Sequence, residues 1–361
     1  MLDAIGPLDT AAMASTAARL DRLTKPPGSL GRLETLAIEL AGIAGRPDAS
    51  VERRAIVVAA GDHGVVRQGV SAYPSDVTAQ MVANFVAGGA AINVLAAWAG
   101  IELVVVDAGV ATAIPDVPRD PVRGGRLIRA RIRDGTADMT QGPAMTRDEA
   151  LRAVATGIDL ACHLWADGLD LVGVGEMGIG NTTTASAITA VLTERPVADV
   201  TGRGTGIDDE THRRKIAAIE RAIEVNGPDA RDPIGVLATV GGLEIAVLVG
   251  LIVGAAEARI PVVLDGFITG SAALVAAALQ PAIAPRLIAA HRSPEPGHAV
   301  ILEWLGRSAV LDLDLRLGEG TGAALAMGLI TAAVRLRDEM ATFESAAISG
   351  PSETGVEPGN T

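Results

Sequence analysis

Residues 169–184 read LDLVGVGEMGIGNTTT: an apolar run of strand length stops at Gly175-Glu176, and a helical stretch follows. A second segment has the same form, because residues 315–317 stop at Gly318-Glu319-Gly320 before another helical stretch. A glutamate between glycines has no neighbouring side chains to shield it, so its carboxylate and the backbone can both approach a ligand closely. We call residues 175–182 the first elbow and residues 315–322 the second elbow, and we predict that they serve one active site.

Apolar runs of strand length alternate with helical stretches from residue 55 onward. The predicted strands are residues 55–60, 102–106, 169–174, 262–264, 287–290 and 309–315, with residues 126–132 as an edge strand or a hairpin. This alternation indicates an α/β fold, a mostly parallel Rossmann-like sheet flanked by helices. Nearly every strand ends in a polar glycine loop, and parallel strands bring such loops to the edge where open α/β sheets bind ligands.

The two chain ends contain no predicted strand. Residues 8–23 and the stretch up to about residue 44 have helical periodicity and are separated by Lys25-Pro26-Pro27-Gly28-Ser29. We expect a large α/β catalytic domain over residues 52–320 and a small helical domain built from residues 1–51 and 321–345. Residues 346–361 are rich in Gly, Pro, Ser and Glu and are expected to form a disordered tail.

The composition narrows the classes of function. With 49% hydrophobic but only 2% aromatic residues in 361, the chain should pack a core of Ala, Val, Leu and Ile. A net charge of -13 argues against a nucleic-acid partner, because that affinity comes from clustered Lys and Arg. The longest apolar run, residues 245–256, is too short to cross a membrane. Asp3 and Asp9 stand where a signal peptide carries positive charge, so a cytoplasmic location is expected.

Cysteine and histidine usage points away from metal chemistry. The single cysteine, Cys162, lies in an apolar helical stretch and is expected to be part of the core. His291 and His298 lie seven residues apart across two prolines, and no His or Cys pair has metal-site spacing. We therefore expect neither a metal nor a cofactor.

Several glycine motifs allow more than one interpretation. Gly173-Val174-Gly175-Glu176-Met177-Gly178 formally matches the dinucleotide fingerprint, with Asp199 at the distance of a ribose ligand, but a pyrophosphate there would be repelled by Glu176. Residues 182–184, three threonines, could instead hold a phosphate or a ribose at the helix start, or Asn181 and Thr182 could only cap the helix.

Two further motifs remain equally open. The glycine-rich residues 201–208 contain Arg203 and precede a helix with Lys215, which suits a phosphate or ribose contact, although a flexible connector has the same composition. Asp62-His63 at the end of a predicted strand could be catalytic or could be a strand-end cap and its hydrogen-bond partner.

The same motifs, in the same order, carry a family resemblance. Together with residues 23–31, 61–65, 293–298 and 316–322, they make the chain similar to the nicotinate-nucleotide:dimethylbenzimidazole phosphoribosyltransferases, which help assemble the lower ligand of cobalamin. The resemblance covers nearly the whole chain. It implies transfer of phosphoribose from nicotinate mononucleotide to 5,6-dimethylbenzimidazole, giving α-ribazole 5'-phosphate and nicotinate. It also implies a homodimer whose small domain is made from both chain ends.

The resemblance implies roles for individual residues. Glu319 matches the general base and Glu176 a position near the nucleotide, so these two are the expected catalytic residues. Base-binding residues are expected at Tyr73, Gln80, Leu317 and Gly318, and nucleotide-binding residues at Gly175, Gly178, Thr182, Thr183, Gly202, Arg203, Gly204, Lys215, Ser293 and Gly320. The family often has methionine where Leu317 stands, an apolar exchange that could adjust the preference for the base.

The implied chemistry fits two carboxylates. The nicotinate ring of the nucleotide is a cationic pyridinium that becomes neutral as it leaves, so its departure needs no general acid. The attacking benzimidazole, in contrast, must lose a proton from its other ring nitrogen. A second carboxylate near the ribose could stabilise oxocarbenium charge. Conversion of a β-nucleotide into an α-product implies inversion by a single displacement. The alternatives are a nicotinamide-dependent oxidoreductase that uses the glycine fingerprint and a non-catalytic sensor that keeps the nucleotide and base pockets.

Overall fold

The computed structural model describes residues 2–204 and 206–349. Two compact units are present: the first contains the residues up to Leu8 and Ser50–Gly328, and the second contains Asp9–Ala49 and the described residues from Leu329 onward. Of the predicted tail, residues 350–361 lie outside the described part. Residues 343–347 form a turn, and the Ile348 N–H that follows it donates to the carbonyl oxygen of Phe343.

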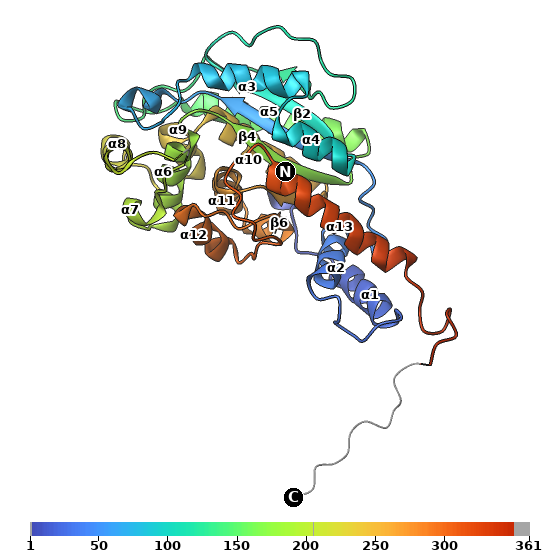
Figure 1. Ribbon diagram of the computed structural model, residues 1–361. Coiled ribbons are helices and arrows are strands. Elements are labelled where there is room, and N and C mark those ends of the chain that lie inside the picture. The colour runs from blue at the N-terminus through green and yellow to red at the C-terminus, as the bar shows by residue number, and fades with distance from the viewer. Residues whose placement is uncertain (1, 205, 350–361) are drawn as a thin grey trace, which may run out of the picture. The chain divides into compact units, whose positions relative to one another are not determined.

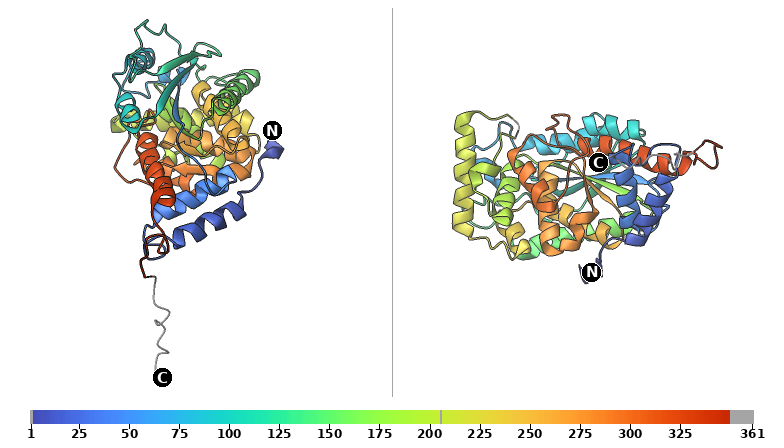
Figure 2. Two further views of the ribbon diagram at one scale, coloured as in Figure 1. Left: turned by 90° about the vertical axis from the view of Figure 1, so that its right-hand side faces the viewer. Right: turned by 90° about the horizontal axis from the view of Figure 1, so that it is seen from below.

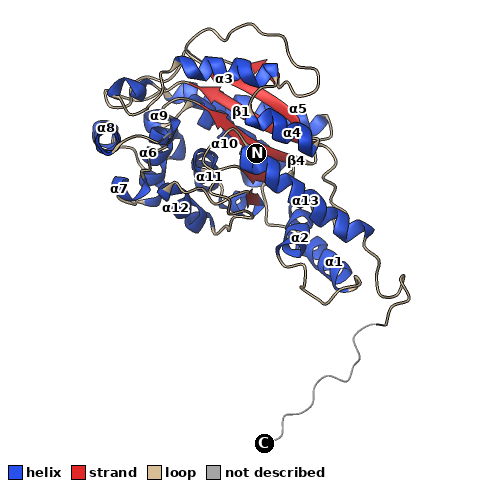
Figure 3. Cartoon of the chain, in the orientation of Figure 1, coloured by secondary structure: helices blue, strands red, loops and turns tan. Residues whose placement is uncertain are grey.

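The first unit contains a six-stranded sheet in the order β3-β2-β1-β4-β5-β6, with every neighbouring pair parallel. This confirms the α/β class, which Figure 3 shows as red strands flanked by blue helices, and the strand order is that of Rossmann-type sheets. The strands are β1 (Arg54–Gly61), β2 (Glu102–Gly109), β3 (Arg126–Arg129), β4 (Leu171–Met177), β5 (Val262–Leu264) and β6 (Leu287–Ala289).

The structure decides two of the strand predictions. Residues 126–129 form the edge strand β3, and because β3 pairs with β2 in parallel, the hairpin alternative is wrong. The predicted strand over residues 309–315 is also wrong, since only Leu311 forms an isolated bridge, to His291. Asp314 there has a φ of +54°, and Leu313 is 53% exposed. A left-handed backbone ends an extended strand, and an exposed leucine gains nothing from sheet burial.

Both faces of the sheet are covered, which explains its nearly continuous apolar strands. Val57 and Ala59 of β1 belong to the main core cluster with helices behind the sheet, whereas Gly173 of β4 faces the side chains of Ile56 and Met327 on the other side. Figures 1 and 2 show this arrangement, with α3 and α4 (cyan) on the opposite side of the sheet from α10 and α11 (gold to orange). The crossover helices thus hold every strand end on one edge.

The helices of the described residues are bounded as follows: α1 (Thr10–Asp21), α2 (Arg32–Ala44), α3 (Asp76–Ala87), α4 (Ala91–Ala99), α5 (Arg147–Ala166), α6 (Asn181–Thr193), α7 (Val197–Val200), α8 (Asp209–Asn226), α9 (Pro233–Val240), α10 (Leu243–Glu257), α11 (Phe267–Leu279), α12 (Pro296–Leu305) and α13 (Thr321–Glu339), with 3-10 turns η1 (Leu2–Ala4), η2 (Gly64–Gln68) and η3 (Pro281–Arg286). Helix α13 begins in the first unit and ends in the second.

The second unit is held by helix packing and by buried arginine contacts. Helix α1 packs on α2, and the guanidinium of Arg337 on α13 is buried and donates to the carbonyl oxygen of Ala49. The Nε of Arg19 on α1 donates to the carbonyl oxygen of Arg337, and Leu23 forms a bridge with Thr342. These contacts connect segments from the two ends of the chain.

Residues 76–99 are apolar and long enough, by composition, to cross a membrane, and half of that window is buried. The structure divides the segment into α3 and α4 at Gly88, whose φ of +81° ends the first helix. Twelve and nine residues are each short of the roughly 20 that a span needs.

The expectation that Cys162 is part of the core is wrong, because its side chain is exposed. Its neighbours Ala161 and Leu164 on α5 are buried instead. One residue along a helix rotates the side chain by about 100°, which is enough to turn Cys162 away from the core.

Backbone contact between α5 and α10 yields a stability prediction. A Cβ atom added at Gly250 would collide with the carbonyl of Val154, and one at Gly157 with that of Val247. We expect Gly250→Ala to lower the free energy of unfolding by about 1–3 kcal/mol, the usual range for overpacking. Urea denaturation measures this, with Gly142→Ala as the control because no atom lies within 4 Å of its added Cβ. Equal stability of the two variants would contradict close packing of these helices.

Candidate active site

A cavity of about 440 Å³ lies at the carboxyl ends of the strands. It lies on the edge to which β1 and β4 bring their final residues, where the strand order reverses and open α/β sheets bind ligands. The first elbow contributes residues from Glu176 to Thr182, the second contributes Arg316 to Glu319, and the loops after β5 and β6 contribute Asp265 and His291.

The two elbows touch each other through glycine. A Cβ atom added at Gly175 would lie 2.6 Å from the carbonyl carbon of Glu319 and from the backbone nitrogen of Gly320. A Cβ atom added at Gly318 would meet Oε1 of Glu176. Any larger residue at either position would separate the elbows, so the glycines beside the glutamates allow both carboxylates to enter the same cavity.

The second elbow has an unusual backbone. Gly318, Glu319 and Gly320 all have positive φ, at +84°, +63° and +86°. Glycine adopts this region freely, but a residue with a Cβ is strained there by roughly 1–2 kcal/mol. Glu319 is therefore held in place by its surroundings rather than by its own preference.

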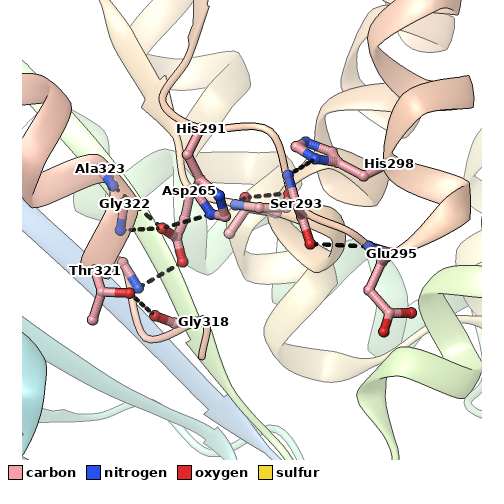
Figure 4. A network of polar contacts seen from close by, with 12 residues as sticks. Asp265, His291, Ser293, Glu295, His298, Gly318, Thr321, Gly322 and Ala323 are labelled. Carbon is pink, nitrogen blue, oxygen red and sulfur yellow. Dashed lines mark hydrogen bonds and ion pairs between the residues drawn. The ribbon is translucent and has the colours of Figure 1, made fainter. Parts of the chain in front are cut away.

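Asp265 supplies those surroundings. Its Oδ2 accepts the N–H of Gly320, while Oδ1 accepts the N–H groups of Gly322 and Ala323, at 2.7–3.2 Å (Figure 4). These N–H groups begin helix α13, whose preceding residue Gly320 has no side chain to cap it. A carboxylate from the end of β5 thus caps a helix that begins 56 residues later.

The cavity carboxyl groups are difficult to ionise. Burial raises the pKa of Glu176 to about 8, and the charges of Asp265, Glu244 and Glu319 act in the same direction against a hydrogen bond from Asn181. Burial and the charge of Asp265 raise the pKa of Glu319 to about 7, although the Ile92 N–H donates to its carboxylate. Burial likewise raises the pKa of Asp265 to about 7. A proton acceptor with a pKa near 7 suits general base catalysis.

A buried network supports the first elbow from behind. His63 Nε2 lies 2.6 Å from Oε1 of Glu244, and its Nδ1 lies 2.9 Å from Oγ1 of Thr184 on α6. A Cβ atom added at Gly178 would lie 3.2 Å from the His63 ring. His63 does not line the cavity, so the interpretation of Asp62-His63 as a strand-end support agrees better with the structure than a catalytic role.

A polar group of residues adjoins the cavity beyond α6. The buried ammonium of Lys215 donates to Oγ1 of Thr182 and to the carbonyl oxygen of Gly202, at 3.0 and 3.1 Å. The Gly204 N–H donates to Oε1 of Glu295 at 2.8 Å. Burial lowers the pKa of Lys215 to about 8, and Glu295 acts against that shift.

The structure brings many of the expected residues to the cavity. Both glutamates line it, and so do Tyr73, Leu317, Gly318, Gly178, Thr182, Gly204 and Ser293. The remaining expected residues lie behind or beside these: Gly175 and Gly320 at the contact between the elbows, Thr183 buried in α6, Gly202 and Lys215 behind Thr182, Arg203 paired with Asp209, and Gln80 exposed on α3.

The sequence did not single out the other cavity residues as site residues, although several of them lie in the predicted strand-end loops. They are Val77, Met81, Met177, Ile179, Asn181, Asp265, Gly266, Phe267, Ile268, His291, Glu295 and Arg316. Asp265 and His291 were visible as polar residues after strands, but nothing in their spacing revealed that Asp265 reaches the start of α13. Among residues 2–204 and 206–349, no three His, Cys, Asp or Glu side chains are placed to hold a metal ion.

Known proteins resemble this chain in sequence and in fold. A family model described as phosphoribosyltransferase matches residues 5–348. The chain belongs to this family. A nicotinate-nucleotide–dimethylbenzimidazole phosphoribosyltransferase of Chloroflexus aggregans is 55% identical over 349 residues, 97% of each chain, and the protein of that name from Geobacter metallireducens is 53% identical over 347 residues, 96% of each. The crystal structure of the protein of that name from Thermus thermophilus is 46% identical in sequence, with a TM-score of 0.87, covering 95% of this chain and all of that one.

Family membership and geometry both argue against a dinucleotide site at the glycine fingerprint of residues 173–178. The description of the matching family names phosphoribosyl transfer and no dinucleotide. Gly175 faces the second elbow and Gly178 faces the carbonyl of Gly61 and the ring of His63, so these glycines serve contacts within the protein. The fingerprint is thus explained without a pyrophosphate.

The raised pKa of Glu176 predicts how stability depends on pH. This pKa is near 8 in the folded protein, whereas a glutamate in the unfolded chain has the ordinary value of 4.5. Folding therefore favours the protonated carboxyl, and the free energy of unfolding falls as pH rises from about 4.5 to 8. Glutamine mimics the protonated carboxyl, so Glu176→Gln should raise Tm at pH 8.5 by about 2 °C or more but change it little at pH 5. Scanning calorimetry at both pH values measures this. An equal change at both would contradict the buried, protonated state.

Proposed function

We propose that this protein transfers phosphoribose from nicotinate mononucleotide to 5,6-dimethylbenzimidazole, giving α-ribazole 5'-phosphate and nicotinate. The observation that carries the proposal is the presence of Glu176 and Glu319 in one cavity that also exposes the Thr182 and Gly204 loops. The names of relatives that are more than 50% identical over nearly the full chain support the same substrates.

The cavity has the mixed lining that these two substrates need. Tyr73, Val77, Met81 and Leu317 offer apolar contacts to a planar aromatic base, and both Tyr73 and Leu317 are more than half exposed. Thr182 at the start of α6 offers its hydroxyl to a phosphate or ribose, with the ammonium of Lys215 directly behind it. In the proposal, direct contact with the base or the nucleotide belongs to the assigned residues that line the cavity, and the remaining ones support them from behind or beside.

Glu319 acts as the general base in this mechanism. The benzimidazole attacks C1' through one ring nitrogen and passes the proton of its other nitrogen to Glu319 as the bond to nicotinate breaks. Positive charge develops on the ribose during this displacement; it favours ionisation of the nearby Glu176, whose carboxylate then stabilises that charge. The carboxylates of Glu176, Glu319 and Asp265 make the cavity favourable to a cationic transition state, and attack from the opposite face inverts C1'.

The two alternatives make different predictions. An oxidoreductase would bind NADH with a saturable change in its fluorescence, whereas Glu176 beside the supposed pyrophosphate turn opposes such binding. A sensor would bind nicotinate mononucleotide and the base without turnover. The transferase should consume both substrates and release one nicotinate for each ribotide, which chromatography with mass spectrometry of the products measures. Nicotinate release without ribotide formation would contradict the proposal.

Replacing Glu319 tests its role directly. We expect Glu319→Gln to reduce kcat by at least about 100-fold, because the variant keeps the side-chain volume but cannot accept the proton. The affinity for nicotinate mononucleotide, measured by calorimetry, should stay nearly unchanged. Glu257→Gln, at an exposed position on α10, serves as the matched control and should retain full turnover. Turnover of Glu319→Gln near that of the control would remove Glu319 from the mechanism.

Lys215 should govern binding of the phosphate rather than the chemical step. We expect Lys215→Ala to raise KM for nicotinate mononucleotide by about 10-fold or more, since charge-assisted contacts contribute roughly 1.5–3 kcal/mol. Because its pKa is near 8, the wild-type affinity should weaken above pH 8 as the ammonium loses its proton. Arg213→Ala removes an exposed positive charge from the same helix and is the control. Steady-state kinetics would contradict this role if both variants had the same KM.

The proposal includes a homodimer and a cytoplasmic location. The resemblance supports the dimer, and we propose that the unit of Asp9–Ala49 with the end of α13 is its small helical domain. The acidic composition supports the absence of nucleic-acid partners. Analytical ultracentrifugation at micromolar concentration measures the oligomeric state.

A further inference from the structure

We propose that Asp265 is a positioning residue of this transferase: its carboxylate caps α13, which holds Glu319 in its left-handed conformation facing the cavity, and its charge acts on the Glu319 carboxylate. The inference rests on the proposed role of Glu319 as general base. It concerns a residue that lies at the end of a different strand from either elbow.

The capping geometry is the first support. Three donors of the α13 start, the N–H groups of Gly320, Gly322 and Ala323, all point to one buried carboxylate. Asp265 is 1% exposed, so water cannot replace it easily. Unsatisfied buried N–H groups each cost about 1–3 kcal/mol, so the loss of Asp265 would release the turn that begins the helix.

The strained backbone beside the cap is the second support. Glu319 immediately precedes Gly320, and it has the positive φ that a residue with a Cβ disfavours. The hydrogen bond from Oγ1 of Thr321 to the carbonyl oxygen of Gly318 closes the same turn. Strain at one residue persists only where neighbouring contacts determine the conformation, and Asp265 provides most of these contacts on the helix side.

Close packing leaves Asp265 no alternative position. A Cβ atom added at Gly322 would lie 2.9 Å from Oδ1 of Asp265 and would overlap the ring of His291. His291 Nε2 lies 3.8 Å from Oδ1, a contact that Figure 4 marks with a dashed line and that is too long for a hydrogen bond. Burial lowers the pKa of His291, which disfavours a charged ring as a partner for Asp265.

The charged groups around Glu319 define the expected effect on pH dependence. Asp265 raises the pKa of Glu319, and Glu176 shares the cavity with both carboxylates. Glu244 acts on Glu176, and Arg316 also lines the cavity. Removing the charge of Asp265 therefore leaves Glu319 easier to ionise, so the base form should persist to lower pH.

The test measures kcat/KM against pH for wild type, Asp265→Asn and Asp265→Ala. In wild type the activity should rise with pH through about 7. Asparagine keeps an acceptor oxygen for Gly322 and Ala323 but no charge, so the acidic limb should move to lower pH by roughly one unit. Alanine removes the cap as well, and kcat should fall about 100-fold with KM for nicotinate mononucleotide changed less than about 3-fold.

Asp107→Asn is the matched control. Asp107 is also a buried carboxylate at the end of a strand and accepts the N–H of Val110, but it does not line the cavity. It should leave both the pH profile and kcat as in wild type. An acidic limb of Asp265→Asn that coincides with wild type and with this control would overturn the inference.

Failure of the inference can be distinguished from failure of the proposed function. If Glu319→Gln loses turnover while Asp265→Asn keeps the wild-type limb and Asp265→Ala keeps kcat, Glu319 remains the base and only the role of Asp265 is wrong. If Glu319→Gln keeps turnover, the proposed role of Glu319 fails first. Should the Asp265 variants not fold, Gly322→Ala keeps the charge but disturbs the cap. It should lower kcat at least about 10-fold without moving the acidic limb, and unchanged kcat would overturn the inference.

Discussion

The contact between Gly175 and the backbone of Glu319 and Gly320 is the constraint on which the active site depends. It joins the end of β4 to the start of α13 at a separation that admits no Cβ atom. Two segments more than 140 residues apart thereby present carboxylates to one cavity. The parallel sheet supplies the common edge, but the absence of side chains at this contact sets how closely the glutamates approach.

Bringing carboxylates together under burial has an electrostatic consequence. Burial raises the pKa values of Glu176, Asp265 and Glu319 to about 8, 7 and 7, and neighbouring carboxylates add to the rise at Glu176 and Glu319. Such a cluster is unfavourable in the empty protein at neutral pH, and it becomes favourable when positive charge develops on a ribose. The same arrangement thus lowers the stability of the folded state and suits the proposed chemistry.

The sequence predicted the parts of this site that are local. Alternation of strands with helices and the glycine-flanked glutamates gave the sheet and the two elbows. Residues 309–315 show the limit, because an alternating apolar pattern cannot reveal the left-handed Asp314 that ends the run. The capping role of Asp265 was equally hidden, since its partners are backbone N–H groups, which carry no residue-specific signal. The exposure of Cys162 could not be predicted because its buried neighbour Ala161 lies only one residue away on the same helix.

The central claim is that burial and neighbouring charge keep Glu319 available as a base near neutral pH. Isotope-edited infrared spectroscopy of the free protein, with Glu319→Gln as the reference, measures it directly. A protonated carboxyl signal that is absent from the variant should titrate in wild type near pH 7. A signal that titrates near the ordinary value of 4.5 would contradict the account.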